Sequence, residues 1–236
     1  MIISVFNFKG GVGKSTTVAN LGAALASKSR KVLVVDLDPQ RTLSYALGVE
    51  VQSPNVLGWL EGDIDVMHTK RQNLDAIAGS FDLLGHPISG GIIAKSLNRI
   101  RGYDIILLDC APAITPVSVE AILSCDRLII PVLSEPAGIK GLAEAVDLVR
   151  EESPDLPIDV LRGRYRKRLV ITQEYDAMLA SGAGELGFNL LKTVIPENIA
   201  IAESVSAQIS VLDYARDSTG AKAFRKLAKE VLNVTA

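Results

Sequence analysis

Short apolar segments alternate along the chain with longer segments of helical periodicity. The apolar segments predict strands over 2–7, 31–36, 74–78, 104–109, 127–132, 157–161 and 190–195, with a short strand near 209–212. The helical pattern covers 15–27, 40–48, 55–61, 91–100, 116–124, 138–152, 173–182, 199–206 and 216–232. Continuous Val, Ile and Leu strands separated by helices are typical of a parallel sheet that is buried on both faces. The sequence therefore predicts a doubly wound α/β fold, in which a mostly parallel sheet lies between two layers of helices.

The composition fits one folded domain over residues 1–236. Hydrophobic residues make up 48% of the chain, enough for a sizeable core, and the net charge is −2. The sequence contains no apolar segment of about eighteen residues and enters its first strand without the features of a signal peptide, so we expect a cytoplasmic protein. Cys110 and Cys125 lie among apolar residues at no metal-binding or redox spacing, which predicts reduced, buried thiols. His68 and His86 suggest no site.

The segment between the first strand and the first helix carries the clearest chemistry. It reads Lys9-Gly-Gly-Val-Gly-Lys-Ser-Thr16. Glycines let the backbone turn tightly and point successive N–H groups at one anion, and the following helix presents its positive end to the same place. A lysine adds charge, and a serine hydroxyl suits a magnesium ion held against phosphates. The alternative is a glycine-rich turn without a ligand. The expected phosphate-binding residues are Lys9, Gly10, Gly11, Val12, Gly13, Lys14, Ser15 and Thr16.

Two further strands are predicted to end in carboxylates. The strand over 31–36 runs into Asp36 and Asp38, and the strand over 104–109 ends in Asp109. Ligands bind at the carboxyl ends of parallel strands, so these three side chains should face the bound phosphates. An aspartate after a strand is also a common helix cap or turn residue, and that alternative stays open for Asp36 and Asp38.

The glycine-rich segment departs from the ordinary P-loop, because Phe8 stands where its first glycine is expected and Lys9 adds a second lysine. In this form, KGGVGKST resembles the deviant Walker A box of the ParA/MinD family of ATPases. DLDPQ at 36–40 resembles the family's switch I, and LLDCAP at 107–112 resembles its Walker B and switch II. The resemblance continues through 129–136, 194–198 and 210–224, and so covers nearly the whole chain.

The resemblance implies a three-layer α/β/α P-loop ATPase that uses ATP and Mg²⁺. Lys14 is then expected to contact the β- and γ-phosphate oxygens, while Ser15, Asp36 and Asp109 surround the magnesium ion. Asp38 is expected to position the attacking water, because the proline that follows holds it extended.

The resemblance also assigns roles outside the phosphate site. In the family the signature lysine, here Lys9, reaches the nucleotide of a second subunit, which implies a homodimer that forms with ATP. The alternative is a Lys9 that lies in solvent beside the loop. Adenine is expected near the loop after 157–161 and near 196–198, with contacts from Arg164, Pro196 and Asn198.

Two basic segments bear on the choice of partner. One is the arginine-rich run 162–168, and the other is expected on the last helix. Small ParA proteins bind DNA without sequence preference as ATP dimers, using basic residues of the C-terminal half. The alternative is that both clusters are solvated charged faces. The expected DNA-binding residues are Arg164, Arg166, Arg168, Arg216, Lys222 and Arg225.

The resemblance thus implies a small ParA-type ATPase for plasmid or chromosome partition, associated with the nucleoid and stimulated by a ParB-like protein at a centromere-like site. A MinD-like membrane ATPase is the main alternative. Membrane binding is unexpected, because the apolar face of the last helix, with Phe224, Leu227, Ala228 and Val231, is predicted to pack on the sheet. An orphan cargo-positioning ATPase, a conjugation-associated ParA-like protein and a non-enzymatic P-loop scaffold also remain open.

Overall fold

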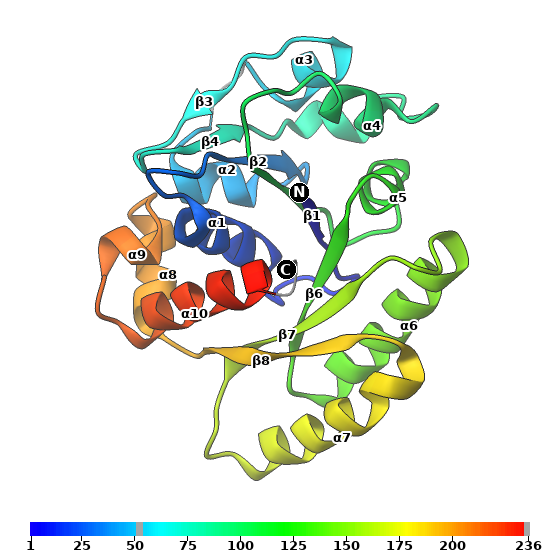
Figure 1. Ribbon diagram of the computed structural model, residues 1–236, viewed down its shortest axis with the longest axis vertical. Helices are drawn as coiled ribbons and strands as arrows, with labels where there is room; N and C mark the ends of the chain where they lie inside the picture. Colours follow the sequence, from blue (N-terminus) through cyan, green and yellow to red (C-terminus); the bar gives the residue numbers. More distant parts are fainter. Residues whose placement is uncertain (51–53, 234–236) are drawn as a thin grey trace.

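A computed structural model describes residues 1–50 and 54–233, and in this part of the chain eight strands form one sheet (Figure 1). The strand order is β3-β4-β2-β5-β1-β6-β7-β8, and every neighbouring pair is parallel except β3 with β4. The strands are β1 (Ile2–Val5), β2 (Val32–Leu37), β3 (Met67–His68), β4 (Leu74–Ile77), β5 (Ile105–Cys110), β6 (Arg127–Leu133), β7 (Ile158–Tyr165) and β8 (Asn189–Pro196).

Helices cover both faces of this sheet. They are α1 (Lys14–Leu25), α2 (Thr42–Leu47), α3 (Val56–Glu61), the 3₁₀ helix η1 (Phe81–Leu84), α4 (Ile92–Leu97), α5 (Pro116–Leu123), α6 (Pro136–Glu152), α7 (Val170–Leu186), α8 (Ile199–Ser206), α9 (Val211–Tyr214) and α10 (Thr219–Asn233). The predicted doubly wound α/β fold is therefore confirmed. None of the described helices is long and apolar enough to cross a membrane.

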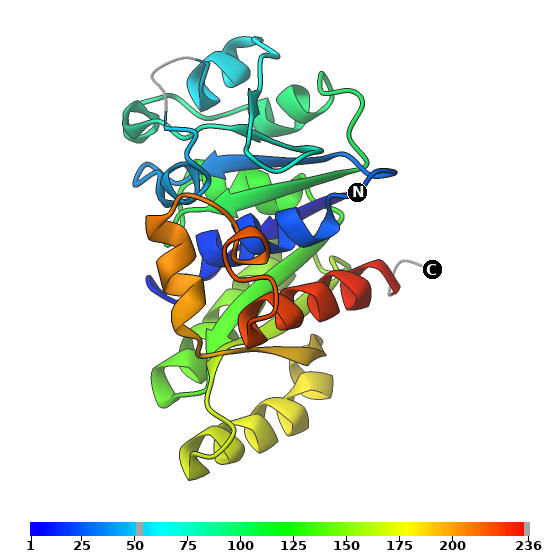
Figure 2. The ribbon, with the colours of Figure 1, turned by 90° about the vertical axis from the view of Figure 1, so that its left-hand side faces the viewer.

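Alternation along β2 shows how one strand serves two cores. Leu33 and Val35 face the core under α3 to α7, whereas Val32 and Val34 face the core under α1, α2 and α8 to α10. Because every residue of β2 is buried, the strand is apolar on both faces, as is typical of a parallel sheet. Figure 2 shows α1 and α10 packed together on one side of the sheet.

The last helix packs as the sequence predicted. Phe224, Leu227 and Val231 are fully buried, and Ala228 is nearly so, in the core that α10 shares with α1. The apolar face of α10 is thus buried against the rest of the domain.

One predicted strand is wrong. Residues 209–212 do not join the sheet, and Val211–Tyr214 form the short helix α9 instead. The cause is tertiary, because the Val211 N–H donates to Asn20 Oδ1 at 2.7 Å and the Ser210 hydroxyl donates to Asp213 Oδ2 at 2.6 Å. These contacts satisfy polar groups that a strand would have paired along a ladder. Neither the edge strand β3 nor the helix η1 was predicted.

Strand β7 is longer than predicted and reaches Tyr165. Arg162 and Arg164 therefore lie on a strand and not in the loop that follows it. The central strand β1 lies between β5 and β6. Strands β2 to β5 lie on one side of β1 and strands β6 to β8 on the other, so the direction in which strands are added reverses at β1. This reversal of strand order is where doubly wound folds bind ligands.

Candidate nucleotide-binding site

The loop between β1 and α1 has the backbone geometry of an anion site. Gly11 and Gly13 adopt φ values of 75° and 94°, in the left-handed region that favours glycine. Gly13 is the N-cap of α1, and no side chain caps this helix end. The first N–H groups of α1 are therefore left for a ligand, and the helix dipole favours a negative one.

Lys14 is almost buried inside this loop, with 6% of its surface exposed. Its ammonium group donates to the carbonyl oxygens of Asn7 and Lys9, at 3.1 Å each. Burial lowers the pKa of Lys14, although the nearby Asp109 and Asp38 carboxylates act to raise it. A buried ammonium group that is hydrogen-bonded to carbonyl oxygens is suited to a polyanion such as a triphosphate.

Lys9 points elsewhere. Its ammonium group forms an ion pair with Glu135, at the N-terminus of α6, and about a third of its side chain is exposed. The backbone below it is fixed by Asn7, whose side chain accepts from the Lys9 N–H at 2.8 Å and donates to the Pro131 carbonyl at 2.8 Å. The two lysines of the loop therefore have different surroundings.

Asp36 is buried at the end of β2, and the protein itself satisfies its carboxylate. Oδ2 accepts from the Ser44 hydroxyl at 2.6 Å and from the Ser44 N–H at 2.9 Å, while Oδ1 accepts from the Asp38 N–H at 3.1 Å. Burial raises the pKa of Asp36 to about 6, and the hydrogen bonds from Ser44 and Asp38 oppose this rise. Asp36 therefore makes the turn and helix contacts that the alternative interpretation expected.

Asp109 lies opposite Asp36 in the sheet register and is fully buried at the end of β5. Among the described residues neither of its carboxylate oxygens has a partner at full hydrogen-bond geometry, although the Ser15 hydroxyl is near enough to act on its pKa. Burial, followed by the Asp36 charge, raises the pKa of Asp109 well above its usual range, against the opposing effects of Ser15 and Lys14. Two buried oxygens without partners fit a water or ion that the polypeptide does not supply.

These residues fit a magnesium ion of the kind that nucleotides carry. Among residues 1–50 and 54–233, no group of three or more His, Cys, Asp or Glu side chains could hold a metal by itself. Mg²⁺ binds through one or two carboxylates, with water and phosphate oxygens completing its shell. The Asp109 carboxylate and the adjacent Ser15 hydroxyl suit that arrangement.

Asp38 is 7% exposed and lies just beyond the end of β2. Its Oδ1 accepts from the Gln40 N–H at 2.9 Å, which is the turn contact that the alternative interpretation expected. The carboxylate is also close enough to Lys14 to act on its pKa. Asp38 therefore lies near Lys14 while its carboxylate holds the turn into α2.

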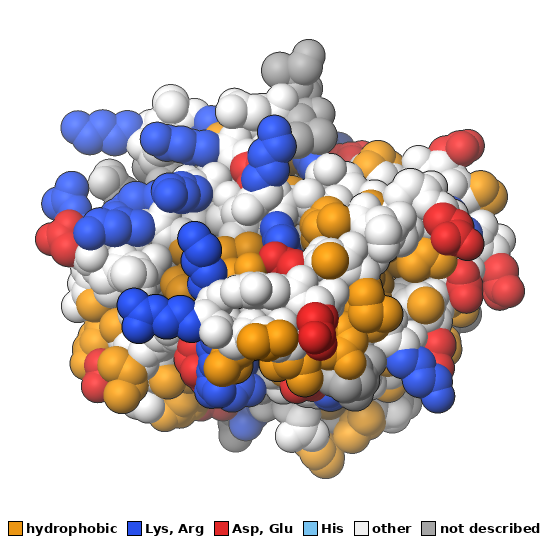
Figure 3. Space-filling view, turned by 90° about the horizontal axis from the view of Figure 1, so that it is seen from below, with side chains coloured by type: hydrophobic (Ala, Val, Ile, Leu, Met, Phe, Trp, Pro, Cys, Tyr) orange, Lys and Arg blue, Asp and Glu red, His pale blue; other side chains and the backbone are white. Residues whose placement is uncertain are grey.

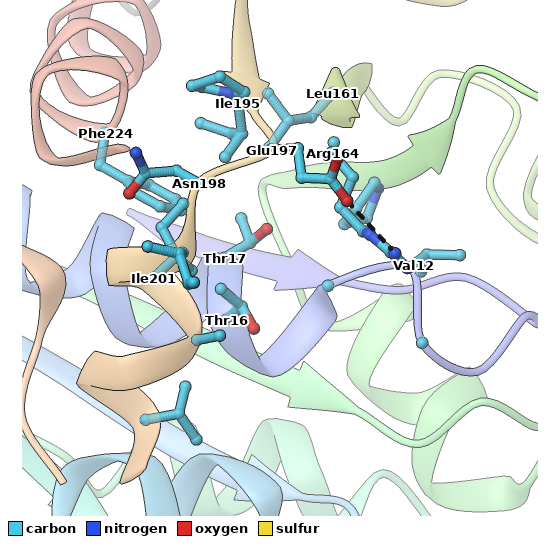
Figure 4. A pocket seen from close by; sticks show the side chains of 18 residues that line it. Val12, Thr16, Thr17, Leu161, Arg164, Ile195, Glu197, Asn198, Ile201 and Phe224 are labelled. Atoms are coloured by element: carbon cyan, nitrogen blue, oxygen red, sulfur yellow. Dashed lines mark ion pairs between the residues drawn. The ribbon is translucent and has the colours of Figure 1, made fainter. Parts of the chain in front are cut away.

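A cavity of about 550 Å³ extends from the loop toward α8 and α10 (Figure 4). Arg164 and Glu197 lie on one side of it near Val12, and Asn198 and Phe224 lie on the other. Ten of the residues that line it are Gly11, Val12, Gly13, Thr16, Thr17, Arg164, Ile195, Pro196, Glu197 and Asn198. The cavity thus brings Arg164, Pro196 and Asn198 together beside the loop, and their contact with adenine stays a prediction.

The arginine-rich run is less exposed than its sequence suggests. Arg162 is buried and donates to Asp176 Oδ2 at 3.0 Å, so it belongs to no surface cluster. Arg166 forms a two-pronged ion pair with Glu197, and Arg164 lies 3.7 Å from the same carboxylate. Arg168 is exposed.

The second basic cluster begins before the last helix, contrary to the predicted bounds. Arg216 lies in the turn that precedes α10, because this helix starts at Thr219. Arg225 donates to the Arg216 carbonyl oxygen at 2.8 Å, and both line a hollow of about 330 Å³ with Arg71 and Asp213. On the face seen in Figure 3, Lys and Arg side chains gather on the left and acidic ones mainly on the right.

The fold and the loop define a P-loop nucleoside triphosphatase. The family described as an AAA domain matches residues 1–158. The chromosome-partitioning ATPase Soj of Thermus thermophilus is 32% identical over 98% of this chain and 94% of its own. The sporulation initiation inhibitor protein Soj of Bacillus subtilis is 32% identical over 98% and 97%. The septum site-determining protein MinD of Pyrococcus horikoshii, complexed with Mg-ADP, superimposes with a TM-score of 0.83 at 29% identity, over 100% of this chain and 97% of its own.

The chain therefore belongs to the ParA/MinD family of P-loop ATPases. It is an ATP hydrolase, and its cofactors are ATP and Mg²⁺.

Sequence reasoning missed three side chains that shape the site. Glu135 and Glu197 each stand in a segment that carried the family resemblance, and each was left without a role although it pairs with a predicted lysine or arginine. Ser44 lies eight positions after Asp36, on α2, and showed no signal beyond being a polar residue in an apolar helix pattern.

Proposed function

We propose that this ATPase partitions plasmid or chromosomal DNA, cycling between an ATP-bound dimer on DNA and a released ADP form. A ParB-like protein bound at a centromere-like site stimulates hydrolysis. One relative named as a chromosome-partitioning ATPase and another named as a chromosome partitioning protein, both similar over nearly the whole chain, support this proposal.

Each site residue then has a role that its surroundings support. Lys14 and the N–H groups at the start of α1 bind the β- and γ-phosphates. Ser15 and Asp109 hold the magnesium ion, which neutralises phosphate charge when bound, and Asp36 supports them from the neighbouring strand. Asp38 orients the attacking water at the same edge of the sheet.

The position of Lys9 is the observation that carries the dimer part of the proposal. Lys14 already places one positive charge inside the loop, whereas the Lys9 ammonium group lies outside it on Glu135. Because the Lys9 ammonium group does not point into its own phosphate loop, it can contact phosphates bound by the loop of a second copy. In the dimer, Lys9 leaves Glu135 and stabilises the phosphates of the partner subunit, as an arginine finger does.

DNA binding in this proposal depends on charge added by dimerisation. One subunit offers few contacts, because Glu197 neutralises part of the cluster around Arg166. A dimer doubles the exposed contacts at high effective concentration, so binding follows ATP without any new chemistry. Neutralised phosphates release counterions, which makes this affinity blind to sequence and sensitive to salt.

A gel shift with unrelated duplexes tests the DNA part. We expect a shift with Mg-ATP that weakens steeply between roughly 50 and 200 mM salt, and none with Mg-ADP. Replacing Arg164, Arg166 and Arg168 by alanine, or separately Arg216, Lys222 and Arg225, should weaken binding equally on all duplexes. The second triple variant should also leave basal hydrolysis in place, because none of its three residues lines the nucleotide cavity. A wild-type protein that ignores DNA with ATP at low salt would overturn the partition proposal.

A matched triple variant controls for the loss of charge alone. Lys28, Lys70 and Lys95 lie outside both clusters, so replacing them by alanine removes the same formal charge from other surfaces. This control should shift DNA like the wild type. Equal weakening by all three triple variants would mean that only net charge matters, and the two clusters would lose their assignment.

A further inference from the structure

Ser44 is the centre of a hydrogen-bond chain that joins three segments of the site. Its hydroxyl donates to Asp36 Oδ2 at 2.6 Å and accepts from the Gly79 N–H at 2.8 Å. Its own N–H donates to the same Asp36 oxygen at 2.9 Å. Ser44 is 1% exposed, so water does not replace these bonds, and a buried group that loses its partner carries the full desolvation penalty.

The chain of bonds continues from Asp36 to Asp38. The second Asp36 oxygen accepts from the Asp38 N–H at 3.1 Å. The backbone that carries the Asp38 carboxylate is therefore fixed by a group that Ser44 itself holds in place. The series Gly79, Ser44, Asp36 and Asp38 connects the end of β4, the helix α2 and the end of β2.

Packing around Gly79 shows how little freedom Asp36 has. A Cβ atom on Gly79 would lie 2.9 Å from Asp36 Cγ and 3.1 Å from Oδ2. Gly79 does not have a positive φ, so its backbone conformation is open to any residue and only space excludes a side chain. The carboxylate of Asp36 is thus clamped between the Ser44 hydroxyl and the Gly79 backbone.

The consequence concerns charge as well as shape. Asp36 stands in register with Asp109, and after burial the like charge of Asp36 acts to raise the pKa of Asp109. The Ser44 hydroxyl and N–H, both on α2, donate to Asp36 Oδ2 and hold the carboxylate in place. Without the hydroxyl, one oxygen of Asp36 keeps a single donor, and the carboxylate and the Asp38 backbone gain freedom together.

We propose that Ser44 is a positioning residue for ATP hydrolysis, which holds Asp36 and, through it, the Asp38 carboxylate at the phosphate loop. The inference rests on the proposed role of Asp38. Ser44 is not among the described residues that line the nucleotide cavity. Its effect should therefore appear in turnover and not in nucleotide affinity.

Steady-state kinetics of the Ser44→Ala variant with Mg-ATP test the inference. We expect kcat to fall by about tenfold or more, the range for losing a hydrogen bond to a charged group, while KM for ATP stays within about threefold. Ser44→Thr, which keeps the hydroxyl, should recover most of the lost kcat. The control is Thr42→Ala, an exposed position on the same helix, which should behave like the wild type.

Gly79→Ala is a second variant, which disturbs Asp36 but retains the Ser44 hydroxyl. It displaces Asp36 by contact, so it should reproduce the loss of kcat even where Ser44→Ala is too unstable to assay. Wild-type kcat in folded Ser44→Ala or in Gly79→Ala, or a loss confined to KM, would overturn the inference. Asp38→Ala is assayed beside them: if it turns over normally, the role of Asp38 fails, and if it is inactive beside an active Ser44→Ala, only this inference fails.

Discussion

Lys9 and Glu135 form an ion pair within one chain, between the phosphate loop and the N-terminus of α6. Both side chains are more than a third exposed, and such a pair is worth at most about 1 kcal/mol. The pair therefore holds Lys9 weakly, and the charge on a triphosphate outweighs it readily. We regard it as the resting position of the lysine that the proposed dimer uses.

Removing the carboxylate partner should make the dimer easier to form. In Glu135→Gln, Lys9 starts without an ion pair, so the protein concentration for half-dimerisation with ATP should fall several-fold, in line with the about 1 kcal/mol above. Sedimentation velocity measures this concentration. Glu144→Gln is the matched control, because it breaks the exposed pair with Lys140 on the same helix. Equal shifts in both variants, or none in Glu135→Gln, would contradict this account of Lys9.

Lys14→Ala should abolish nucleotide binding without unfolding the chain. Within the described part of the chain the side chain donates to two carbonyl groups alone, at 3.1 Å each, so its loss removes little from the fold and most of the positive charge from the loop. We expect Mg-ATP affinity measured by calorimetry to fall by more than about tenfold. Lys28→Ala, an exposed lysine beyond α1, serves as the control. Unchanged binding and hydrolysis in Lys14→Ala would show that the loop is wrongly assigned.

Both cysteines should be inert in the folded protein. Cys110 is fully buried and Cys125 is 9% exposed, and burial raises the pKa of each thiol. Alkylation at neutral pH should therefore be slow for the native protein and rapid after denaturation, as mass spectrometry would record. Rapid modification of either thiol in the native state would contradict the buried positions.

Glu230 predicts a pH-dependent contribution to stability. Burial acts to raise its pKa, but a hydrogen bond from the Thr193 side chain and those from the Thr193 and Lys192 N–H groups, at 2.9 and 2.6 Å, outweigh burial and the pKa is lowered. A lowered folded-state pKa gives stability that is present above the unfolded value near 4.5 and is lost as the pH falls through the folded-state value. Glu230→Gln should thus be less stable than the wild type at neutral pH.

Urea denaturation from neutral pH down to roughly pH 3 measures this difference. The gap in free energy of unfolding should close toward acid pH. Glu185→Gln, at an exposed position on α7, should show no such gap. A gap that stays constant with pH would mean that Glu230 contributes by shape and not by charge.

Local sequence was enough to predict the strand, turn and helix around the loop and the proximity of Asp36 and Asp109. A strand, a glycine turn and a helix follow one another within 2–25, so the geometry at Gly13 and Lys14 depends on neighbours in sequence. The rule for parallel strands placed Asp36 and Asp109 together, and the register confirms that they are opposite.

The surface charges were harder to predict, because they depend on distant partners. Arg162 is buried and paired with Asp176 on α7, and Arg166 is paired with Glu197, which directly follows β8. Neither partner is adjacent in sequence, so the run 162–168 looked uniformly exposed. The same holds for α9, where a side chain of α1 satisfies the backbone that would have formed a strand.

Light scattering of the wild type, Asp38→Ala and Lys9→Ala, each with Mg-ATP and with Mg-ADP, tests the central claim most directly. Asp38→Ala should bind ATP and persist as a dimer, because only the positioning of water is lost, while Lys9→Ala should bind ATP and stay largely monomeric. All three should be monomers with ADP. Masses that do not depend on the nucleotide in the wild type and Asp38→Ala would contradict the claim that ATP joins two copies of this chain.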